Sequence, residues 1–199
     1  MHLPRRSSSR GSHRRGSRRL RNAIFETWIT KLFDRNLLRI DPLSGIHDRS
    51  GFDSRVEPLD RYLKAHSGHD DRTRLASCFV LSQGEQKAIG FYTLEATWIS
   101  LVDLPLPIAK KIPSYPVAPA VLMARFAVDN KMRGCGLGRF MLMDAFSRVL
   151  SSQKNIYALI VEANDEAAVS FYKAHCFLRL AVSGRRLFLP FAEIAKLFT

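Results

Sequence analysis

The chain has 199 residues, of which 46% are hydrophobic, and this is enough for one domain with a substantial core. Its formal net charge of +13 and pI near 10.2 favour an anionic partner, nucleic acid first, over a basic one. Its three cysteines are widely spaced and form no CxxC pair, so we expect no disulfide framework, no metal site and a reducing, cytoplasmic compartment. No apolar stretch is long enough to span a bilayer, so we expect no membrane association.

The beginning of the chain differs in composition from the rest. The first 21 residues hold eight arginines among serines and glycines, and no acidic residue precedes Glu26. Such a segment cannot bury enough apolar surface to fold, so we predict a basic disordered extension over residues 1–39 and a folded domain over residues 40–199. Three interpretations of the extension stay open: an RNA-binding arm, a solvated tail, and upstream DNA translated from a misplaced start.

The first half of the folded part is predicted from hydrophobic periodicity. A helix over residues 56–65 has Pro58 in its first turn and apolar residues on one side. Two strands, at residues 78–81 and 89–94, form a hairpin. A connection rich in proline and lysine, residues 105–119, then leads into an apolar strand over residues 121–128.

The second half alternates helices and strands. Asn164 is a residue that can cap a helix, with acidic residues following in the first turn. The predicted elements are a helix from about Gly138 to Ser152, a strand at 156–162, a helix from Asn164 to Ala174, strands at 178–182 and 186–189, and a short helix over 191–199. The order of elements predicts an α/β fold with a mixed sheet covered by helices on both faces.

A glycine-rich stretch lies between the strand over residues 121–128 and the helix that follows it. Its sequence is Arg133-Gly-Cys-Gly-Leu-Gly138. Glycines let a ligand approach the backbone closely, and the first amides of a helix have no intrahelical partner. Together they form a seat for a pyrophosphate, although a glycine-rich turn without any ligand is the alternative. The spacing fits neither a dinucleotide fingerprint nor a P-loop.

Together with Phe126-Ala-Val128, this stretch resembles motif A of the N-acetyltransferases of the GNAT family. A second segment, Asn164-Asp-Glu-Ala-Ala-Val-Ser-Phe-Tyr-Lys-Ala-His-Cys-Phe177, resembles motif B of that family, N-x-x-A-x-x-F-Y-x-x-x-G-F. The resemblance implies the GNAT fold, in which the mixed central sheet is splayed between two strands, and it implies acetyl-coenzyme A as cosubstrate. The implied cosubstrate-binding residues are Phe126, Ala127, Val128, Arg133, Gly134, Cys135, Gly136, Leu137, Gly138, Asn164 and Phe171.

Motif B also implies a catalytic residue. Tyr172 stands where the family commonly has the general acid that protonates the departing thiolate; the alternative is a packed aromatic ring whose hydroxyl bonds to backbone. No general base is evident, since His175 is expected to end a helix and Glu162 is a weak candidate at a strand end. The missing base favours an α-amine acceptor, whose pKa is about 8. Cys176 replaces the usual Gly of motif B and, at positive φ, would cost about 1 kcal/mol.

Within the GNAT family the chain resembles the toxins of type II toxin–antitoxin systems that acetylate aminoacyl-tRNA, over about residues 52–190. The resemblance implies a translation-inhibiting toxin with tRNA and a ribbon-helix-helix antitoxin as partners, and we expect a homodimer. The candidate tRNA contacts, any of which could be an ordinary solvated charge, are Lys110, Lys111, Arg125, Arg185 and Arg186. Two other functions stay open: a GNAT enzyme for protein N-termini or small amines, and a non-catalytic module that binds RNA or a partner.

Overall fold

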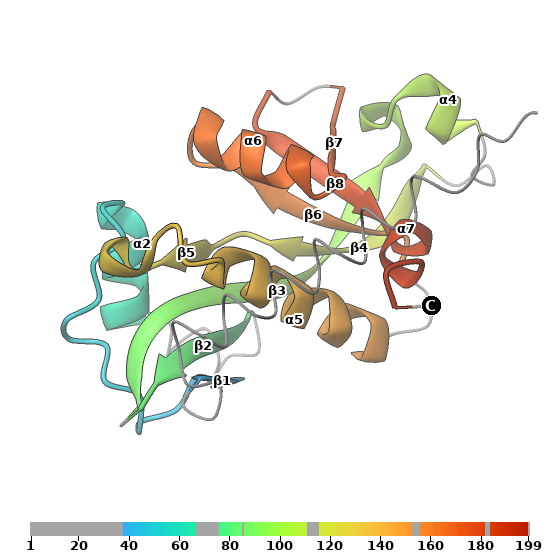
Figure 1. Ribbon diagram of the computed structural model, residues 1–199. Helices are drawn as coiled ribbons and strands as arrows, with labels where there is room; N and C mark the ends of the chain where they lie inside the picture. The colour runs from blue at the N-terminus through green and yellow to red at the C-terminus, as the bar shows by residue number, and fades with distance from the viewer. Residues whose placement is uncertain are drawn as a thin grey trace, which may run out of the picture.

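A computed structural model describes residues 38–66, 76–84, 86–110, 116–152, 156–181 and 184–198. Its centre is an eight-stranded sheet with the order β1-β2-β3-β4-β6-β8-β7, in which β5 also pairs with β3 (Figure 1). The strands are β1 (Leu38–Pro42), β2 (Ser77–Gln83), β3 (Lys87–Ser100), β4 (Val117–Met123), β5 (Phe126–Val128), β6 (Ala158–Glu162), β7 (Leu178–Arg179) and β8 (Arg186–Pro190). Strands β4 and β6 are parallel and the other strand pairs are antiparallel, so the sheet is mixed, as predicted.

Helices cover both faces of this sheet, which confirms the predicted architecture. Adjacent strand residues point to opposite faces. Leu81 and Tyr92 pack in the cluster that includes Leu142 of α5, whereas their neighbours Val80 and Phe91 pack with Leu63, beside α2. The helices on the first face are α5 (Leu137–Ser152), α6 (Glu166–Ala174) and α7 (Phe191–Ala195), and α5 crosses the front of the sheet in Figure 1. The other face carries α2 (Glu57–Arg61), which continues as a π-helical turn (Tyr62–His66), and α4 (Leu106–Ala109).

The strand predicted over residues 121–128 is two strands, and this break is the feature that opens the sheet. β3 pairs with both of them, through Glu95–Ser100 with β4 and through Gly90–Tyr92 with β5. β6 follows β4 up to Met123 and pairs with no residue of β5. The sheet therefore divides between β5 and β6, which confirms the splay that the resemblance implies.

Two further elements differ from the predictions. No strand is predicted at residues 38–42, but β1 pairs there with β2 at the edge of the sheet, where its Pro42 is tolerated. The proline-rich connection contains α4, which begins after Pro105, and a 3₁₀ turn at Leu101–Asp103 precedes it. None of the helices in the described part of the chain is both long and apolar enough to cross a membrane. Residues 1–37 of the extension predicted over residues 1–39 lie outside the described residues.

Candidate active site

The division of the sheet leaves polar backbone groups of β5 without a strand partner. Thr93 N donates to Arg125 O (3.0 Å) and Asp129 N donates to Ile89 O (2.9 Å). Bonded and non-bonded residue pairs alternate in an antiparallel ladder, so Phe126 and Val128 direct their N–H and C=O groups away from β3. On that side β6 has already diverged, and these groups face the opening.

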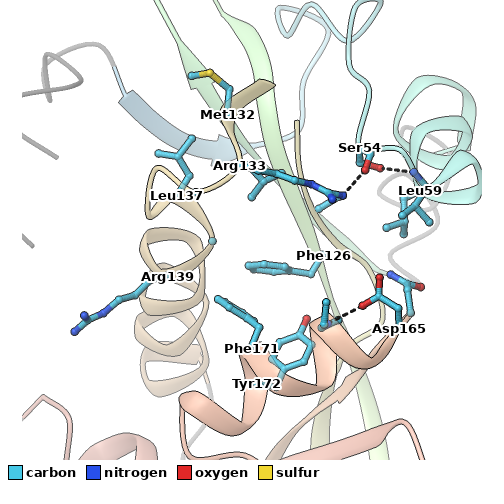
Figure 2. A pocket seen from close by; sticks show the side chains of 18 of the residues that line it. Ser54, Leu59, Phe126, Met132, Arg133, Leu137, Arg139, Asp165, Phe171 and Tyr172 are labelled. Atoms are coloured by element: carbon cyan, nitrogen blue, oxygen red, sulfur yellow. Dashed lines mark hydrogen bonds between the residues drawn. The ribbon is translucent and has the colours of Figure 1, made fainter. Parts of the chain in front are cut away.

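A cavity of about 470 Å³ occupies this opening, between β5, the start of α5 and α6 (Figure 2). Most of the residues predicted to bind the cosubstrate line it together with the predicted acid: Phe126, Ala127, Val128, Arg133, Gly134, Gly136, Leu137, Gly138, Asn164, Phe171 and Tyr172. Cys135 is not among the lining residues; its thiol lies 3.7 Å from Arg133 O. Two separate segments of the chain, residues 126–138 and residues 164–172, thus meet at one cavity.

Backbone conformation explains two of the three glycines in the loop. Gly134 and Gly136 both have a φ of +77°, a conformation that other residues rarely adopt. Gly138 differs, because a Cβ there would lie 3.5 Å from the Phe171 ring, an ordinary van der Waals contact. Phe140 N donates to Gly136 O (3.1 Å), which leaves the amides of residues 137–139 before the first intrahelical bond. These amides belong to the helix start that borders the cavity.

A segment that the sequence analysis did not assign to the site completes its wall. The buried carboxylate of Asp129 accepts from Lys131 N (2.9 Å) and from Asp53 N (3.2 Å). Arg133 Nη2 donates to Ser54 O, as the dashed line in Figure 2 shows. Residues 53 and 54 are therefore held against the glycine loop, although no local signal in the sequence connects the two segments.

Tyr172, the predicted acid, is buried among aromatic rings. Its side chain is 3% exposed, and its ring lies 6.2 Å from the ring of Phe126 and 5.3 Å from those of Phe171 and Phe177. Within the described part of the chain the Tyr172 hydroxyl has no hydrogen bond, so the backbone bond of the alternative interpretation is not found. Burial raises the pKa of Tyr172 well above the ordinary value of a phenol, because the phenolate would lose its hydration.

The two ends of α6 hold Tyr172 in place. The N-cap is Asp165, not Asn164 as predicted: Asp165 has the extended backbone of a cap, and its carboxylate accepts from Ala168 N (2.7 Å). At the other end, Phe177 N donates to Tyr172 O (3.2 Å) and Cys176 N to Lys173 O (3.1 Å), a Schellman arrangement. Cys176 has a φ of +70°, as the motif led us to expect. His175 ends the helix, and its Nδ1 donates to Phe171 O (2.8 Å).

A second cavity of about 490 Å³ adjoins the first. Its lining residues come from α2 with its π-helical turn, from the break between β4 and β5, and from the end of β6: Pro58, Leu59, Arg61, Tyr62, Ala124, Arg125 and Glu162. Leu59 and Glu162 line both cavities. The Arg125 guanidinium lies 3.8 Å from the centre of the Tyr62 ring and pairs with Glu95 (3.2 Å).

Three of the five candidate tRNA contacts lie near these cavities. Arg125 lines the second cavity, Arg186 pairs with Glu162 (2.7 Å), and Arg185 donates to Asn164 O (3.0 Å). Lys110 follows α4 and lines neither cavity; in Figure 1, α4 lies at the opposite end of the molecule from α2. Lys111 lies outside the described residues. Across the described ranges, no group of three or more His, Cys, Asp or Glu side chains could hold a metal ion.

The sequence is similar to known acetyltransferases. The model of the Acetyltransferase (GNAT) family matches residues 46–176. A tRNA-acetylating toxin of Mycobacterium tuberculosis is 32% identical over 132 residues, which cover 65% of this chain and 78% of that protein. The probable toxin TacT of Sinorhizobium fredii is 26% identical over 169 residues, which cover 79% of this chain and 93% of that protein.

Solved structures agree with the sequence comparison. A tyrosine-to-phenylalanine mutant of KacT superimposes with a TM-score of 0.76 at 30% identity, covering 81% of this chain and 99% of that one. AtaT complexed with acetyl-methionyl-tRNAfMet has the same identity and coverages and a TM-score of 0.75. A mutant AtaT toxin bound to the C-terminus of the antitoxin AtaR and to acetyl-CoA has a TM-score of 0.70 at 27% identity, covering 81% and 98%.

Proposed function

This chain belongs to the GNAT family of acetyltransferases, and on that premise we propose that it transfers an acetyl group from acetyl-coenzyme A to the α-amino group of aminoacyl-tRNA. Capping that amino group would block translation, so the proposed role is that of a toxin in a toxin–antitoxin system. A relative that is named as a tRNA-acetylating toxin, and the solved complex of AtaT with acetyl-methionyl-tRNAfMet, support this substrate. The observation that carries the proposal is a cavity where the open edge of β5, the start of α5 and the Tyr172 hydroxyl meet.

Two parts of acetyl-coenzyme A, the acetyl donor, match groups that line the first cavity. The outward N–H and C=O groups of Phe126 and Val128 can bond to the amides of a pantetheine arm as a neighbouring strand would. The amides at the start of α5, with the positive end of the helix dipole, suit a pyrophosphate. An N–H of β5 beside the thioester carbonyl would stabilise the negative charge that develops on its oxygen.

The acceptor then enters from the second cavity. Its amine nitrogen attacks the thioester carbonyl carbon, the carbon–sulfur bond breaks, and the departing thiolate takes the Tyr172 hydroxyl proton. The raised pKa of Tyr172 keeps that proton in place at neutral pH until the thiolate appears. The proton that the amine loses goes to solvent, from which Tyr172 is reprotonated.

Partners follow from the same comparison. The AtaT toxin has been solved with its antitoxin, and we propose a comparable partner of ribbon-helix-helix type, a homodimeric toxin and a cytoplasmic location beside the tRNA pool. Light scattering tests the homodimer, and co-purification with the product of the neighbouring reading frame tests the antitoxin.

The experiment that tests the function is Tyr172→Phe, measured with charged tRNA as acceptor. We expect acetyl-coenzyme A to bind the variant as it binds the wild type in calorimetry, while turnover falls at least about tenfold because the thiolate loses its acid. Tyr157→Phe, a half-buried tyrosine that lines neither cavity, is the matched control.

Three results would contradict the proposal. Unchanged turnover in Tyr172→Phe would remove that residue from the mechanism. Faster acetylation of peptide N-termini or free amines than of charged tRNA would reassign the acceptor. Failure of folded wild-type protein to take up acetyl-coenzyme A would overturn the enzymatic account.

A further inference from the structure

Glu162 stands at the junction of the two cavities. It is the last residue of β6, at the point where that strand has diverged from β5. Together with Leu59 it lines both the donor cavity and the second cavity, and its side chain is 46% exposed. A group that passes from one cavity to the other meets this carboxylate.

One of the two oxygen atoms of the Glu162 carboxylate already accepts a hydrogen bond. Arg186 Nε donates to Glu162 Oε1 at 2.7 Å, and the two residues face each other across the β6–β8 ladder. Among the described residues, Oε2 of Glu162 accepts no hydrogen bond. Because a carboxylate offers about four lone-pair sites, Glu162 retains the capacity to bind a donor from a ligand.

The other charged side chains that line the second cavity, and the other carboxylate of the donor cavity, already have partners. In the second cavity, Arg61 pairs with Glu57 (3.0 Å) and Arg125 with Glu95 (3.2 Å). In the donor cavity, the carboxylate of Asp165 caps α6. Of the two carboxylates that line the cavities, Glu162 is thus the one that keeps an oxygen, Oε2, for a donor from a ligand, beside its pair with Arg186.

The geometry points to Glu162 as the residue that anchors the α-ammonium group of the acceptor, through Oε2, with Arg186 as the positioning residue that fixes the carboxylate. This inference rests on the proposed function and specifies how the acceptor is recognised. At pH 7 most of an α-amine with a pKa of about 8 carries a positive charge, so a carboxylate is its natural partner. The site therefore selects for a free amino group before any chemistry begins.

The test compares two tRNA ligands that differ only in this group. One carries its amino acid, and the other carries the corresponding 2-hydroxy acid, which has no ammonium and acts as a competitive inhibitor. In Glu162→Gln we expect the KM for aminoacyl-tRNA to rise about tenfold, as for loss of a charge-assisted hydrogen bond. The inhibition constant of the hydroxyacyl-tRNA and the Kd of acetyl-coenzyme A stay at their wild-type values.

Further variants separate an anchor from a structural role. Glu162→Asp keeps the charge and should recover part of the lost affinity, and Arg186→Gln should raise the KM less than Glu162→Gln. Glu166→Gln is the matched control, because Glu166 also pairs with an arginine, Arg179 (3.2 Å), but lines neither cavity.

Two outcomes in Glu162→Gln would overturn the inference. An unchanged KM would show that the carboxylate does not bind the acceptor, and an equal rise in KM and inhibition constant would show that it acts on tRNA binding in general. Wild-type protein that leaves charged tRNA unmodified would instead overturn the proposed function. The wild-type protein is assayed first, so this result is known before any variant is compared.

Discussion

Burial changes the chemistry of two tyrosines on the α5 face of the sheet. Tyr92 is fully buried, and its pKa is raised first by burial and then by its hydrogen bond to Asp144 and the charge of that residue, against the opposing effect of Arg148. The pKa of Tyr172 is raised by burial alone. The first hydroxyl is committed to a structural bond between β3 and α5, and the second is left available to a ligand.

The raised pKa of Tyr172 predicts a loss of stability in alkali. Below about pH 10 both folded and unfolded chains keep the phenol protonated; above it the unfolded chain releases the proton while the folded chain retains it, so the free energy of unfolding decreases as pH rises. Urea unfolding between pH 9 and 11 should therefore show a less steep decrease for Tyr172→Phe than for the wild type. Identical slopes would contradict the buried, protonated state of this hydroxyl.

The backbone of Cys176 carries strain that a glycine would relieve. At a φ of +70° a side chain destabilises the folded state by about 1–2 kcal/mol. Replacing it with glycine removes this strain, but about 0.5–1 kcal/mol of the gain is lost because glycine gives the unfolded chain more conformational freedom. We expect Cys176→Gly to raise the free energy of unfolding by about 0.5–1 kcal/mol in chemical denaturation. Cys176→Ala, which keeps a Cβ, should remain at the wild-type value; equal midpoints for the two variants would contradict the strain.

At the scale of elements, the site depends on how two of them end. β5 is three residues long and holds its position through pairing with β3 alone, while α5 begins nine residues after β5 ends, beyond a turn that needs two positive φ angles. The turn is further fixed by Asp129 and Arg133, which bind the segment around Ser54. The donor cavity is therefore set by the ends of elements rather than by their interiors.

Gly136→Ala tests this dependence. The substitution strains the turn at a φ of +77° and shifts the first amides of α5, so we expect coenzyme A affinity to fall about tenfold, with a stability loss of about 1 kcal/mol. Gly84→Ala is the matched control: its φ of +57° gives comparable strain in the turn after β2, where a Cβ meets no atom within 4 Å. Equal coenzyme A affinity in calorimetry for both variants would contradict a pyrophosphate seat at this loop.

For the whole molecule, charge is distributed unevenly along the chain. Residues 1–37 contain ten of the 31 basic side chains but only two of the 18 acidic ones. In the described part, the arginines near the cavities are largely paired, as Arg125 is with Glu95 and Arg186 with Glu162. About a third of the basic side chains of the chain thus lies before β1.

Salt dependence measures what that charge contributes. Each phosphate contact adds about 0.7–0.9 to the slope of log affinity against log salt concentration. We expect the chain lacking residues 1–36 to bind coenzyme A as the full chain does but to show a shallower salt slope for charged tRNA in filter binding. Equal slopes would identify the basic extension as a solvated tail.

Patterns that are local in the sequence determined much of this protein. The glycine loop, the buried helix face of α5 and the helix that carries Tyr172 depend on neighbouring residues, and the order of elements predicted the mixed α/β sheet; the splay of that sheet came from the resemblance of two motifs to the GNAT family. These features follow from backbone sterics and from helical or strand periodicity, which act over a few residues.

Contacts between distant segments decided the rest. The break at Ala124 and Arg125 divides a continuous apolar run, because β3 pairs with both halves and β6 with only one. The wall at Ser54 and the pairing of Glu162 with Arg186 likewise join residues from separate elements. Such pairings depend on burial and register across the whole sheet, and no local pattern encodes them. The tertiary structure alone therefore showed where the second cavity lies and which carboxylate borders both.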